Sequence, residues 1–578
     1  MDDADRGRLA PALRQLNRLR SPFAAAPALA LALFLGPVLA GLLGTLLPAV
    51  GWLPALGAAA LTLAPWRALL AAPELPGAVA LSLASGTLST ALALLAAILV
   101  LAGLHARPAI RILRPCLLPL LAVPHLSVAI GLAFLLTPSG WPWRVAALLL
   151  GWERPPDIAA VNDPLGLALT LGLAVKEAPF FLLALLAAAA QVDAPRQLRL
   201  ARSLGYGPGE AWLKVLLPQL LPQVRLPALA VLAYGLSVVD MAIVLGPATP
   251  PPLAPLLWRW FNDPDLAMRL PAAAGAMLLL GMLGLTSLAM QRIAGFLAWR
   301  LRPRLLSGPH PSREPWLRAA GSLAAALTLG LGLAALVGLV VWAFAGRWTF
   351  PMLLPEGWTL ATAAEVLTGL ASPVATTLLL ALLSSGIATI LVVLSVEHEA
   401  LAGRRPAARV LPLAYLPLMV PQIAFLFGVA VLLAWLGLDG TVAGVAWMHL
   451  VFVLPYVLLM LRDPWLALDP RFARTARSLG HGPAAVLAGV KLPLLLRPLL
   501  LAAAVGVAVS VAQYLPTLVA GGGRVATLAT ETLALASGGD RRRAAVAGLA
   551  IATIPLVALA LAVAIPAWHA WHRAGLRR

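Results

Sequence analysis

Charged residues are scarce in this chain of 578 residues. Only 11% are Asp, Glu, Lys or Arg, whereas a soluble protein carries about 25%. Lysine is especially rare, and Lys176, Lys214 and Lys491 are its three occurrences. A P-loop requires the pattern G-x-x-x-x-G-K-[ST], in which the lysine reaches the phosphates, and none of these lysines follows a glycine. The chain therefore has no such motif for ATP, and we predict no cofactor of its own.

Catalytic and metal-binding patterns are missing too. Cys116 is the single cysteine, which excludes an internal disulfide. His449 lies in the apolar segment AWMHLVF without a second ligand at metal-site spacing, and this favours packing over a metal site. The formal net charge of +19 does not indicate nucleic acid, because the basic residues sit in short loops without interleaved aromatic residues. We predict neither an enzyme active site nor a bound metal.

Long apolar runs dominate what is present. The chain is 61% hydrophobic, with a mean hydropathy of +0.92. Runs of about 18 or more apolar residues indicate helices that cross a bilayer, so we predict an all-α polytopic membrane protein with about 12 transmembrane helices. The predicted spans are 24–50, 78–104, 115–136, 163–190, 224–246 and 271–297, followed by 317–345, 373–396, 410–436, 443–461, 498–520 and 544–568.

The basic residues orient these helices. The first span follows a basic N-terminal segment and is longer than the apolar core of a signal peptide, so we expect it to remain as the first helix. Most of the 42 Lys and Arg residues fall in alternate loops, and basic loops face the cytoplasm. This asymmetry predicts a multi-pass protein of a bacterial inner membrane with both termini in the cytoplasm.

The chain repeats itself. ARSLGYGPGEAWLKVLLP begins at Ala201, and ARSLGHGPAAVLAGVKLP begins at Ala476. VPHLSVAIG at Val123 and VPQIAFLFG at Val420 form a second echo. Each copy occupies the same place within six predicted helices, so the halves are parallel repeats related by an axis along the membrane normal. We therefore divide the chain into modules 1–298 and 319–578, joined by a cytoplasmic linker at 299–318.

The repeated loops, 196–222 and 471–497, have a helix–turn–helix pattern. In each loop the glycines after the first helix can adopt positive φ, and a proline can begin a second short helix. A further proline ends the pattern. We expect each loop to hold a short helix, fixed by a tight turn, on the cytoplasmic face, where it can dock into a groove of another protein. The alternative is a surface loop that only joins two spans.

The spacing G-x9-[aliphatic]-x-L-P in both loops resembles the "EAA" coupling loop of type I ATP-binding-cassette (ABC) importer permeases, and the two joined modules look most like fused iron(III)/thiamine-type permeases. The resemblance implies a cytoplasmic ABC ATPase dimer that binds Mg-ATP and receives these loops, and a periplasmic solute-binding protein on the other side. The family glutamate is replaced by Arg199 and Arg474. The implied coupling residues are Ala201, Gly205, Gly207, Pro208, Leu217, Pro218, Ala476, Gly480, Gly482, Pro483, Leu492 and Pro493.

Ionisable residues inside membrane spans are costly and usually functional. We expect Lys176, Glu177, Asp240 and Gln513 to line a path between the halves. Alternatively, Lys176 forms a structural pair with an acid, or these residues lie near a membrane interface. Glu397, with its neighbours His398 and Glu399, lies at a predicted cytoplasmic helix end and is expected to be solvated.

These features together predict the permease subunit of an ABC importer for a small solute such as iron(III) or thiamine. Two other classes fit the topology. A secondary transporter can also have two six-helix halves, and its intramembrane charges would bind protons or ions. A membrane scaffold would need neither Asp240 nor Lys176. The duplicated loop favours the importer, while path residues of both signs leave the solute open.

Overall fold

The computed structural model describes residues 22–308, 314–401 and 416–571. Most of them are helical. Within these ranges the sheet structure is one short antiparallel hairpin, in which β1 (Trp52–Leu53) pairs with β2 (Ala58–Ala59). Helices satisfy their own backbone hydrogen bonds, which is the requirement for crossing hydrocarbon.

The first half comprises the described residues up to 308. Its elements beyond the hairpin are α2 (Ala25–Ala49), η1 (Pro54–Leu56), α3 (Ala64–Ala71), α4 (Leu75–Leu104), α5 (Ala109–Ala122), α6 (His125–Leu136), α7 (Trp141–Leu150), α8 (Leu167–Gln191), α9 (Ala194–Ser203), α10 (Pro208–Ala211), η2 (Trp212–Leu216), α11 (Leu217–Leu220), α12 (Arg225–Ser237), α13 (Asp240–Leu245), α14 (Leu253–Phe261), η3 (Leu266–Met268) and α15 (Arg269–Leu306).

The second half comprises the described residues from 314 onward. Its elements are α16 (Glu314–Ala325), η5 (Ala326–Gly330), α17 (Leu331–Phe344), α18 (Ala361–Gly369), α19 (Ala371–Leu401), α21 (Gln422–Trp435), α22 (Val442–Ala467), α23 (Pro470–Ser478), α24 (Pro483–Val486), η6 (Leu487–Lys491), α25 (Leu492–Leu494), α26 (Leu496–Val511), α27 (Leu515–Gly521), α28 (Leu528–Ser537) and α29 (Arg541–Trp571).

Nine helices of the described residues are long and apolar enough to cross a membrane, and two bent helix pairs raise this to eleven if each pair is one span. The all-α polytopic class is therefore confirmed. The predicted span 410–436 begins outside the described residues, and its described helix, α21, has 14 residues. The predicted span 115–136 is divided, because α5 and α6 are separate helices on either side of Pro124.

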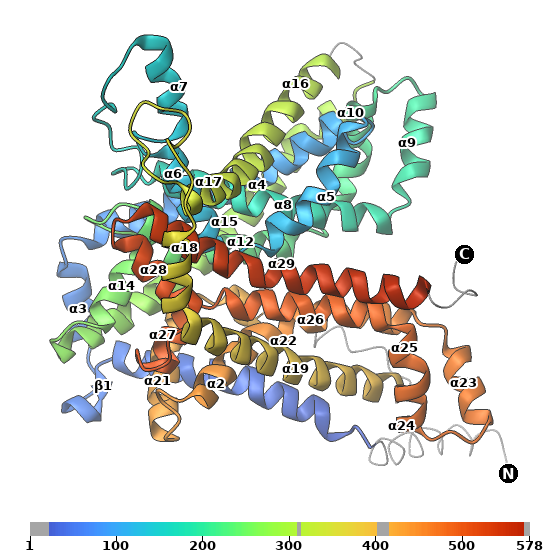
Figure 1. Cartoon of the computed structure of the whole chain (residues 1–578). Coiled ribbons are helices and arrows are strands. Elements are labelled where there is room, and N and C mark those ends of the chain that lie inside the picture. Colours follow the sequence, from blue (N-terminus) through green and yellow to red (C-terminus); the bar gives the residue numbers. More distant parts are fainter. Residues whose placement is uncertain (1–21, 309–313, 402–415, 572–578) are drawn as a thin grey trace.

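The first span of each half packs against the other half. α2 lies against α19, α21 and α22 of the second half, whereas α16 and α17 lie against α4 and α6 of the first half. Figure 1 shows this exchange, with the blue α2 running along the yellow and orange helices. The division at 299–318 thus separates two sequence repeats, but the packing crosses it. Helix also occupies much of that segment, because α15 continues to Leu306 and α16 begins at Glu314.

Glycines allow these exchanged helices to approach closely. A Cβ on Gly428 of α21 would lie 2.1 Å from the carbonyl oxygen of Gly41 in α2. A Cβ on Gly321 of α16 would lie 2.6 Å from the carbonyl oxygen of Leu99 in α4. Small residues at such contacts are typical of membrane helix pairs, where backbone approach replaces the hydrophobic effect as the source of affinity.

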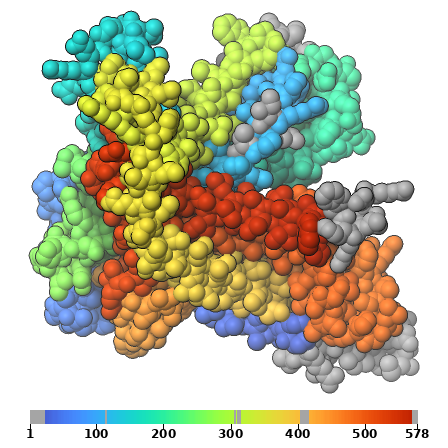
Figure 2. Space-filling view, viewed as in Figure 1, coloured from blue at the N-terminus to red at the C-terminus, as the bar shows by residue number. Residues whose placement is uncertain are grey.

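The molecule has two distinct ends. In Figure 1 the repeated loops, with α9 and α23, lie at the right, while the β1–β2 hairpin, α14 and α18 lie at the left. Figure 2 shows the two loops at separate corners of the right-hand end, the first in blue-green and the second in orange. Both loops therefore face the same side of the molecule, as parallel repeats require.

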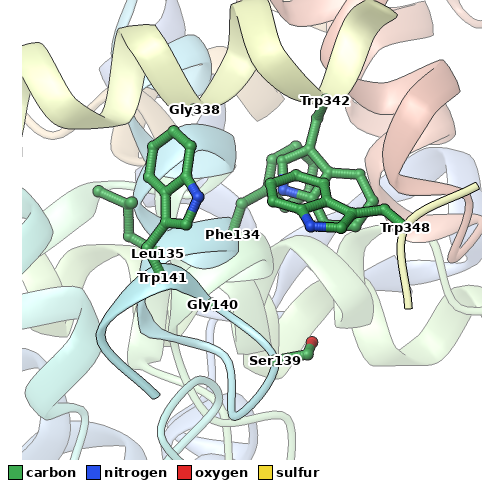
Figure 3. Close-up of a pocket in the computed structure, with 8 residues that line it drawn as sticks. All are labelled: Phe134, Leu135, Ser139, Gly140, Trp141, Gly338, Trp342 and Trp348. Carbon is green, nitrogen blue, oxygen red and sulfur yellow. The ribbon is translucent and has the colours of Figure 1, made fainter. Parts of the chain in front are cut away.

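An aromatic cluster joins the halves at the opposite end (Figure 3). The rings of Trp342 and Trp348, from the second half, have centroids 4.7 Å apart, and Phe134 of the first half lies 5.6 Å from Trp342. Arg144 of α7 is only 2% exposed. Its Nη1 donates to the carbonyl oxygen of Thr349 at 2.8 Å, and its guanidinium lies over the Trp348 ring. These contacts make α7 part of a structural connection between the halves.

Candidate functional site

The two repeated loops adopt the same backbone path. The first helix of each, α9 or α23, ends just before a glycine in the left-handed region, with φ of 89° at Gly205 and 88° at Gly480. Extended N-cap glycines, Gly207 and Gly482, then precede α10 and α24. The loop segment from α10 or α24 onward meets the following membrane helix at 82° in both halves. The repeat is thus present in the backbone structure as well as in the sequence.

Both loops also contain a π-helix at the same position, η2 (Trp212–Leu216) or η6 (Leu487–Lys491). Each π-helix is followed by a Leu-Pro pair, Leu217-Pro218 or Leu492-Pro493. Proline removes one backbone donor and clashes with the carbonyl four residues before it, and a wider turn relieves both effects. The L-P end of the sequence pattern therefore accounts for the π-turn and the bend that follows.

The helix before the glycine is largely exposed in both loops, whereas the helix after it is exposed in the second loop alone. In α9, Leu200 is 63% exposed, and in α23, Phe472 is 51% exposed. Ala201 and Ala476 are buried, where a small side chain lets the first helix pack closely on the rest of the loop. We expected the helix after the glycine to dock. In the first half Glu210 and Ala211 of that helix are buried, whereas Pro483, Ala484 and Ala485 of the second loop are exposed.

Lysines fix both loops to the body of the protein. Lys214 Nζ pairs with Glu210 at 2.9 Å and donates to the carbonyl oxygens of Ser307 and Gly308 at the end of the first half. In the second loop, Lys491 Nζ lies 2.5 Å from Glu397 Oε2 of α19. Glu397 is 1% exposed, so our expectation that it is solvated was wrong. Each loop can therefore pass a displacement to a membrane helix or to the connecting segment.

Each half breaks its fifth predicted span at an equivalent position. α12 ends at Ser237 and α13 begins at Asp240. α26 ends at Val511 and α27 begins at Leu515, with Gln513 in the gap. The segments SVVD and SVAQ align Asp240 with Gln513. We predicted continuous helices here. Discontinuous membrane helices present free backbone groups and are common at transporter binding sites.

His449 of α22 connects the two pieces of the second broken helix. Its Nδ1 lies 2.7 Å from the Ser510 hydroxyl in α26, and its Nε2 lies 2.9 Å from the Thr517 hydroxyl in α27. The imidazole is 2% exposed. Within the described residues, no group of three His, Cys, Asp or Glu side chains could hold a metal ion. His449 therefore acts as a hydrogen-bonded connection across the break.

A polar group lies beside the first break. His125 Nε2 lies 2.8 Å from Glu177 Oε1. The His125 ring also packs on the ring of Tyr234, with centroids 4.4 Å apart. The Tyr234 hydroxyl in turn donates to Asp240 Oδ1 at 3.4 Å. These contacts join α6, α8, α12 and α13, and they bring Glu177 and Asp240 into one polar group.

Tyrosines of the second half interact with these acids. Tyr456 of α22 lies within electrostatic range of Glu177, and Tyr514 lies within electrostatic range of Asp240. Gln513 is 8% exposed, and its side-chain amide donates to the carbonyl oxygen of Val509. The two acids of the first half thus lie within electrostatic range of phenol groups of the second half.

Lys176 points elsewhere. Its ammonium donates to the carbonyl oxygens of Leu120 at 2.8 Å and Leu121 at 3.0 Å. It is 4% exposed, and these bonds place it at the C-terminal end of α5. Successive residues of a helix point about 100° apart, so the side chains of Lys176 and Glu177 lie in different surroundings.

A cavity of about 330 Å³ lies near the polar group. It is lined by Ile243 of α13, by Tyr514 at the second break, and by residues of α27 and α28, among them Glu531 and Thr530. α27 and α28 belong to the end opposite the repeated loops (Figure 1). The cavity therefore opens between the halves, with both broken helices at its wall.

Sequence reasoning missed His125, Tyr234 and Tyr456. His125 directly follows the proline of the repeated Val-Pro pair, so the repeat could have marked this histidine as a candidate site residue. Tyr456 directly follows Pro455 within α22. Nothing in the local sequence indicates that Tyr234 reaches Asp240, because that contact depends on the break in the helix between them.

Comparison with known proteins agrees with this architecture. No protein-family model matches the chain. Its sequence is 34% identical over 520 residues to the inner membrane ABC transporter permease protein YnjC of Escherichia coli (strain K12). The alignment covers 90% of this chain and 93% of that protein. This degree of identity, over nearly the full length of both chains, shows that the chain belongs to the ABC transporter permeases of the inner membrane.

Proposed function

We propose that the chain is the membrane permease subunit of an ABC importer, which moves a small solute from a periplasmic binding protein to the cytoplasm. As a permease subunit, it leaves ATP hydrolysis to a separate polypeptide. The observation that carries the importer assignment is the pair of repeated loops, with matching glycine φ values, π-turns and 82° bends at one end of the molecule. Two equivalent loops suit two ATPase subunits.

The solute path runs through the polar group at the two helix breaks. Glu177 and Asp240 provide two carboxylates, with His125, Gln513 and the tyrosines of the second half around them. Lys176 lies outside this path, since backbone carbonyls surround its ammonium. An acidic path with aromatic neighbours attracts a cation, through charge and through the faces of the rings. A cationic solute, such as thiamine or an iron(III) species, fits this chemistry.

The periplasmic partner delivers the solute at the end opposite the loops. The cavity near Tyr514 and Glu531 opens there, and α7 projects at the same end of the molecule. In this arrangement both termini lie in the cytoplasm, on the side of the loops. Closure of the ATPase subunits would move the loops, and Lys491 with Glu397 would transmit that motion to α19.

An ion-gradient transporter is the rival, and one comparison separates the two. The purified chain is placed in proteoliposomes with or without a cognate ABC ATPase subunit, and cation uptake is measured with Mg-ATP or with an imposed proton gradient. We expect uptake only with ATPase and Mg-ATP. A variant in which Gly-Ser linkers replace α9 and α23 should abolish it. Uptake that follows the gradient and ignores the ATPase would overturn the proposal.

A further inference from the structure

The cavity of about 330 Å³, at the end opposite the repeated loops, is large enough for a small molecule. Sites for small ligands range from about 300 to about 1,000 Å³. Its wall is mainly apolar and includes Ile243 of α13, Tyr514, and Thr530, Glu531 and Ser537 of α28. The hydroxyls of Thr530 and Ser537 donate hydrogen bonds to carbonyl oxygens of their own segment. The Glu531 carboxylate and the Tyr514 phenol are therefore the polar groups best placed to hold a ligand.

Glu531 gives this cavity a negative charge. Among the described residues of the wall it is the one carboxylate, and none of them is basic. Its side chain is partly buried, and it forms no ion pair within the described ranges. The nearby Arg524 pairs with Asp439 at 2.5 Å, and Arg543 pairs with Glu365. A partly buried carboxylate without a charged partner is costly, so a cation that enters the cavity is stabilised there.

The cavity adjoins the polar group at the first helix break. Ile243 follows Asp240 by three residues in α13, so the two side chains share a face, about 4.5 Å apart along the helix axis. Tyr514, which lines the cavity, lies within electrostatic range of Asp240. A cation in the cavity is thus close to the inner acids. Two successive acidic positions allow a cation to enter and still move on, because neither has to bind it very tightly.

The groups of the wall suit an organic cation better than a bare metal ion. A metal site requires several ligands, and no group of three His, Cys, Asp or Glu side chains in the described residues could hold one. An organic cation spreads its charge over a larger volume and also has apolar surface. One carboxylate, one aromatic ring and apolar walls bind such a molecule, since a cation is attracted to both the charge and the ring.

We propose that this cavity is an entrance subsite for a small organic cation. Glu531 selects for positive charge, and Tyr514 provides the aromatic group of the wall. The inference rests on the proposed function, because an entrance subsite has a role only in a chain that carries a solute across the membrane. It narrows the solute from cations in general to small organic ones of the ammonium type.

Cysteine chemistry tests the charge preference without knowledge of the natural solute. Cys116→Ser removes the single cysteine. Ala534→Cys then places a thiol in the cavity wall, three residues after Glu531 on α28. In lipid nanodiscs that hold the full-length chain, the thiol reacts with cationic trimethylammonioethyl methanethiosulfonate or with the anionic sulfonatoethyl reagent. Ala55→Cys, exposed in a stretch without charged residues, gives the reference ratio of the two rates.

The ratio of the cationic to the anionic rate should be at least about 5-fold higher at position 534 than at position 55, because the Glu531 charge acts on the two reagents with opposite sign. Glu531→Gln in the same background should return the ratio to the reference value. The matched control, Glu153→Gln on an exposed loop, should leave it within about 2-fold. Equal ratios at the two positions, or a high ratio that survives Glu531→Gln, would overturn the proposal.

Protection of the same thiol tests the class of ligand. Its reaction with neutral N-ethylmaleimide is measured in tetraethylammonium chloride, in MgCl₂ and in NaCl at equal ionic strength. We expect tetraethylammonium to slow the reaction at least about 2-fold once half of the sites are filled, and Mg²⁺ to match Na⁺. Glu531→Gln should remove the protection. Equal protection by Mg²⁺, or none by tetraethylammonium, would contradict an organic-cation site.

These measurements omit the ATPase, so their outcome is separate from that of the uptake assay. If the charge preference and the protection are found but Mg-ATP drives no uptake, the cation site stands, and its role as an entrance fails together with the proposed function. If Mg-ATP drives uptake and the thiol at position 534 shows no charge preference, the proposed function stands and this inference alone is wrong.

Discussion

Lys176 Nζ donates a hydrogen bond to the carbonyl oxygen of Leu120 at 2.8 Å. In an uninterrupted helix that oxygen would accept from the backbone nitrogen four residues later, which here belongs to Pro124 and carries no hydrogen. The same ammonium reaches the carbonyl oxygen of Leu121 at 3.0 Å. A cation at the C-terminal end of α5 also interacts favourably with the helix dipole. Lys176 thus completes the hydrogen bonding of a helix that a proline interrupts.

Replacing this lysine should affect stability more than solute affinity. Lys176→Met removes the ammonium that donates hydrogen bonds to two carbonyl oxygens, and we expect the free energy of unfolding to fall by about 1–3 kcal/mol. Lys176→Arg keeps the positive charge and the donors, so its effect should be smaller. Thermal unfolding in detergent measures the change. An unaltered melting temperature together with a large change in KM for uptake would show that Lys176 contacts the solute and does not mainly stabilise α5.

The acids of the path should behave in the opposite way. Asp240→Asn and Glu177→Gln preserve shape but remove charge, and we expect each to reduce uptake of a cationic solute at least about 10-fold, which corresponds to about 1.4 kcal/mol. Expression and ATPase binding should stay unchanged. Asp157→Asn, on an exposed outer loop, is the matched control. Unchanged uptake by both path variants, with normal folding, would remove these acids from the path.

His449 should control the second break. His449→Phe fills a similar volume but leaves the hydroxyls of Ser510 and Thr517 without the imidazole, and we expect a loss of about 1–3 kcal/mol of stability. Uptake should fall as well, because α26 and α27 lose their connection. His449→Gln can bond at both ends of its amide and should be milder. Equal stability of the Phe and Gln variants would show that the two hydrogen bonds contribute little.

The turn glycines give a test that isolates backbone conformation. Gly480 has φ of 88°, and a Cβ there would meet no atom within 4 Å. Gly480→Ala therefore introduces strain without a clash, and we expect about 1 kcal/mol of destabilisation of the turn, with weaker ATPase coupling. Gly489→Ala, in η6, also meets no atom and has no positive φ, so it serves as the control. Solute-stimulated ATP hydrolysis measures the coupling, and equal rates for the two variants would contradict the role of the turn.

The sequence was sufficient for features that depend on local pattern. Apolar runs predicted most membrane helices because hydrocarbon requires about 20 apolar residues per span. The glycines and prolines of the repeated loops predicted their turns, because only glycine adopts positive φ without strain. The apolar runs around Glu177 and Asp240 placed both acids in membrane spans, and the structure brings them to one polar group.

Other features depend on contacts between distant segments. The break before Asp240 follows two valines that occur in ordinary membrane helices, so composition gave no sign of it. Glu397 looked solvated because it lies beside other polar residues, yet Lys491 from a segment far along the chain buries it. The exchange of α2 and α16 between halves depends on glycine pairs whose partners no local pattern identifies.

The exchanged helices make a prediction about the halves as folding units. If each half were independent, residues 1–308 expressed alone would fold. Instead, α2 packs on α19, α21 and α22, and Gly428 N donates to Thr45 Oγ1 at 3.2 Å across the exchange. We expect each half alone to aggregate or be degraded, because α2 and α16 would expose glycine-lined faces made for the other half.

Expressing both halves together, with the chain cut between 308 and 314, should restore a complex that co-purifies and transports. The split pair carrying Gly428→Leu is the sensitive variant, because its side chain would collide with the backbone of Gly41 and Gly44. Gly386→Leu is the control, because a Cβ at Gly386 meets no atom within 4 Å and its φ is not positive. Gly437 is less suitable, since its positive φ would add strain to any substitution. Stable, monodisperse folding of either half by itself would show that the exchange is not needed to form the helices' native packing.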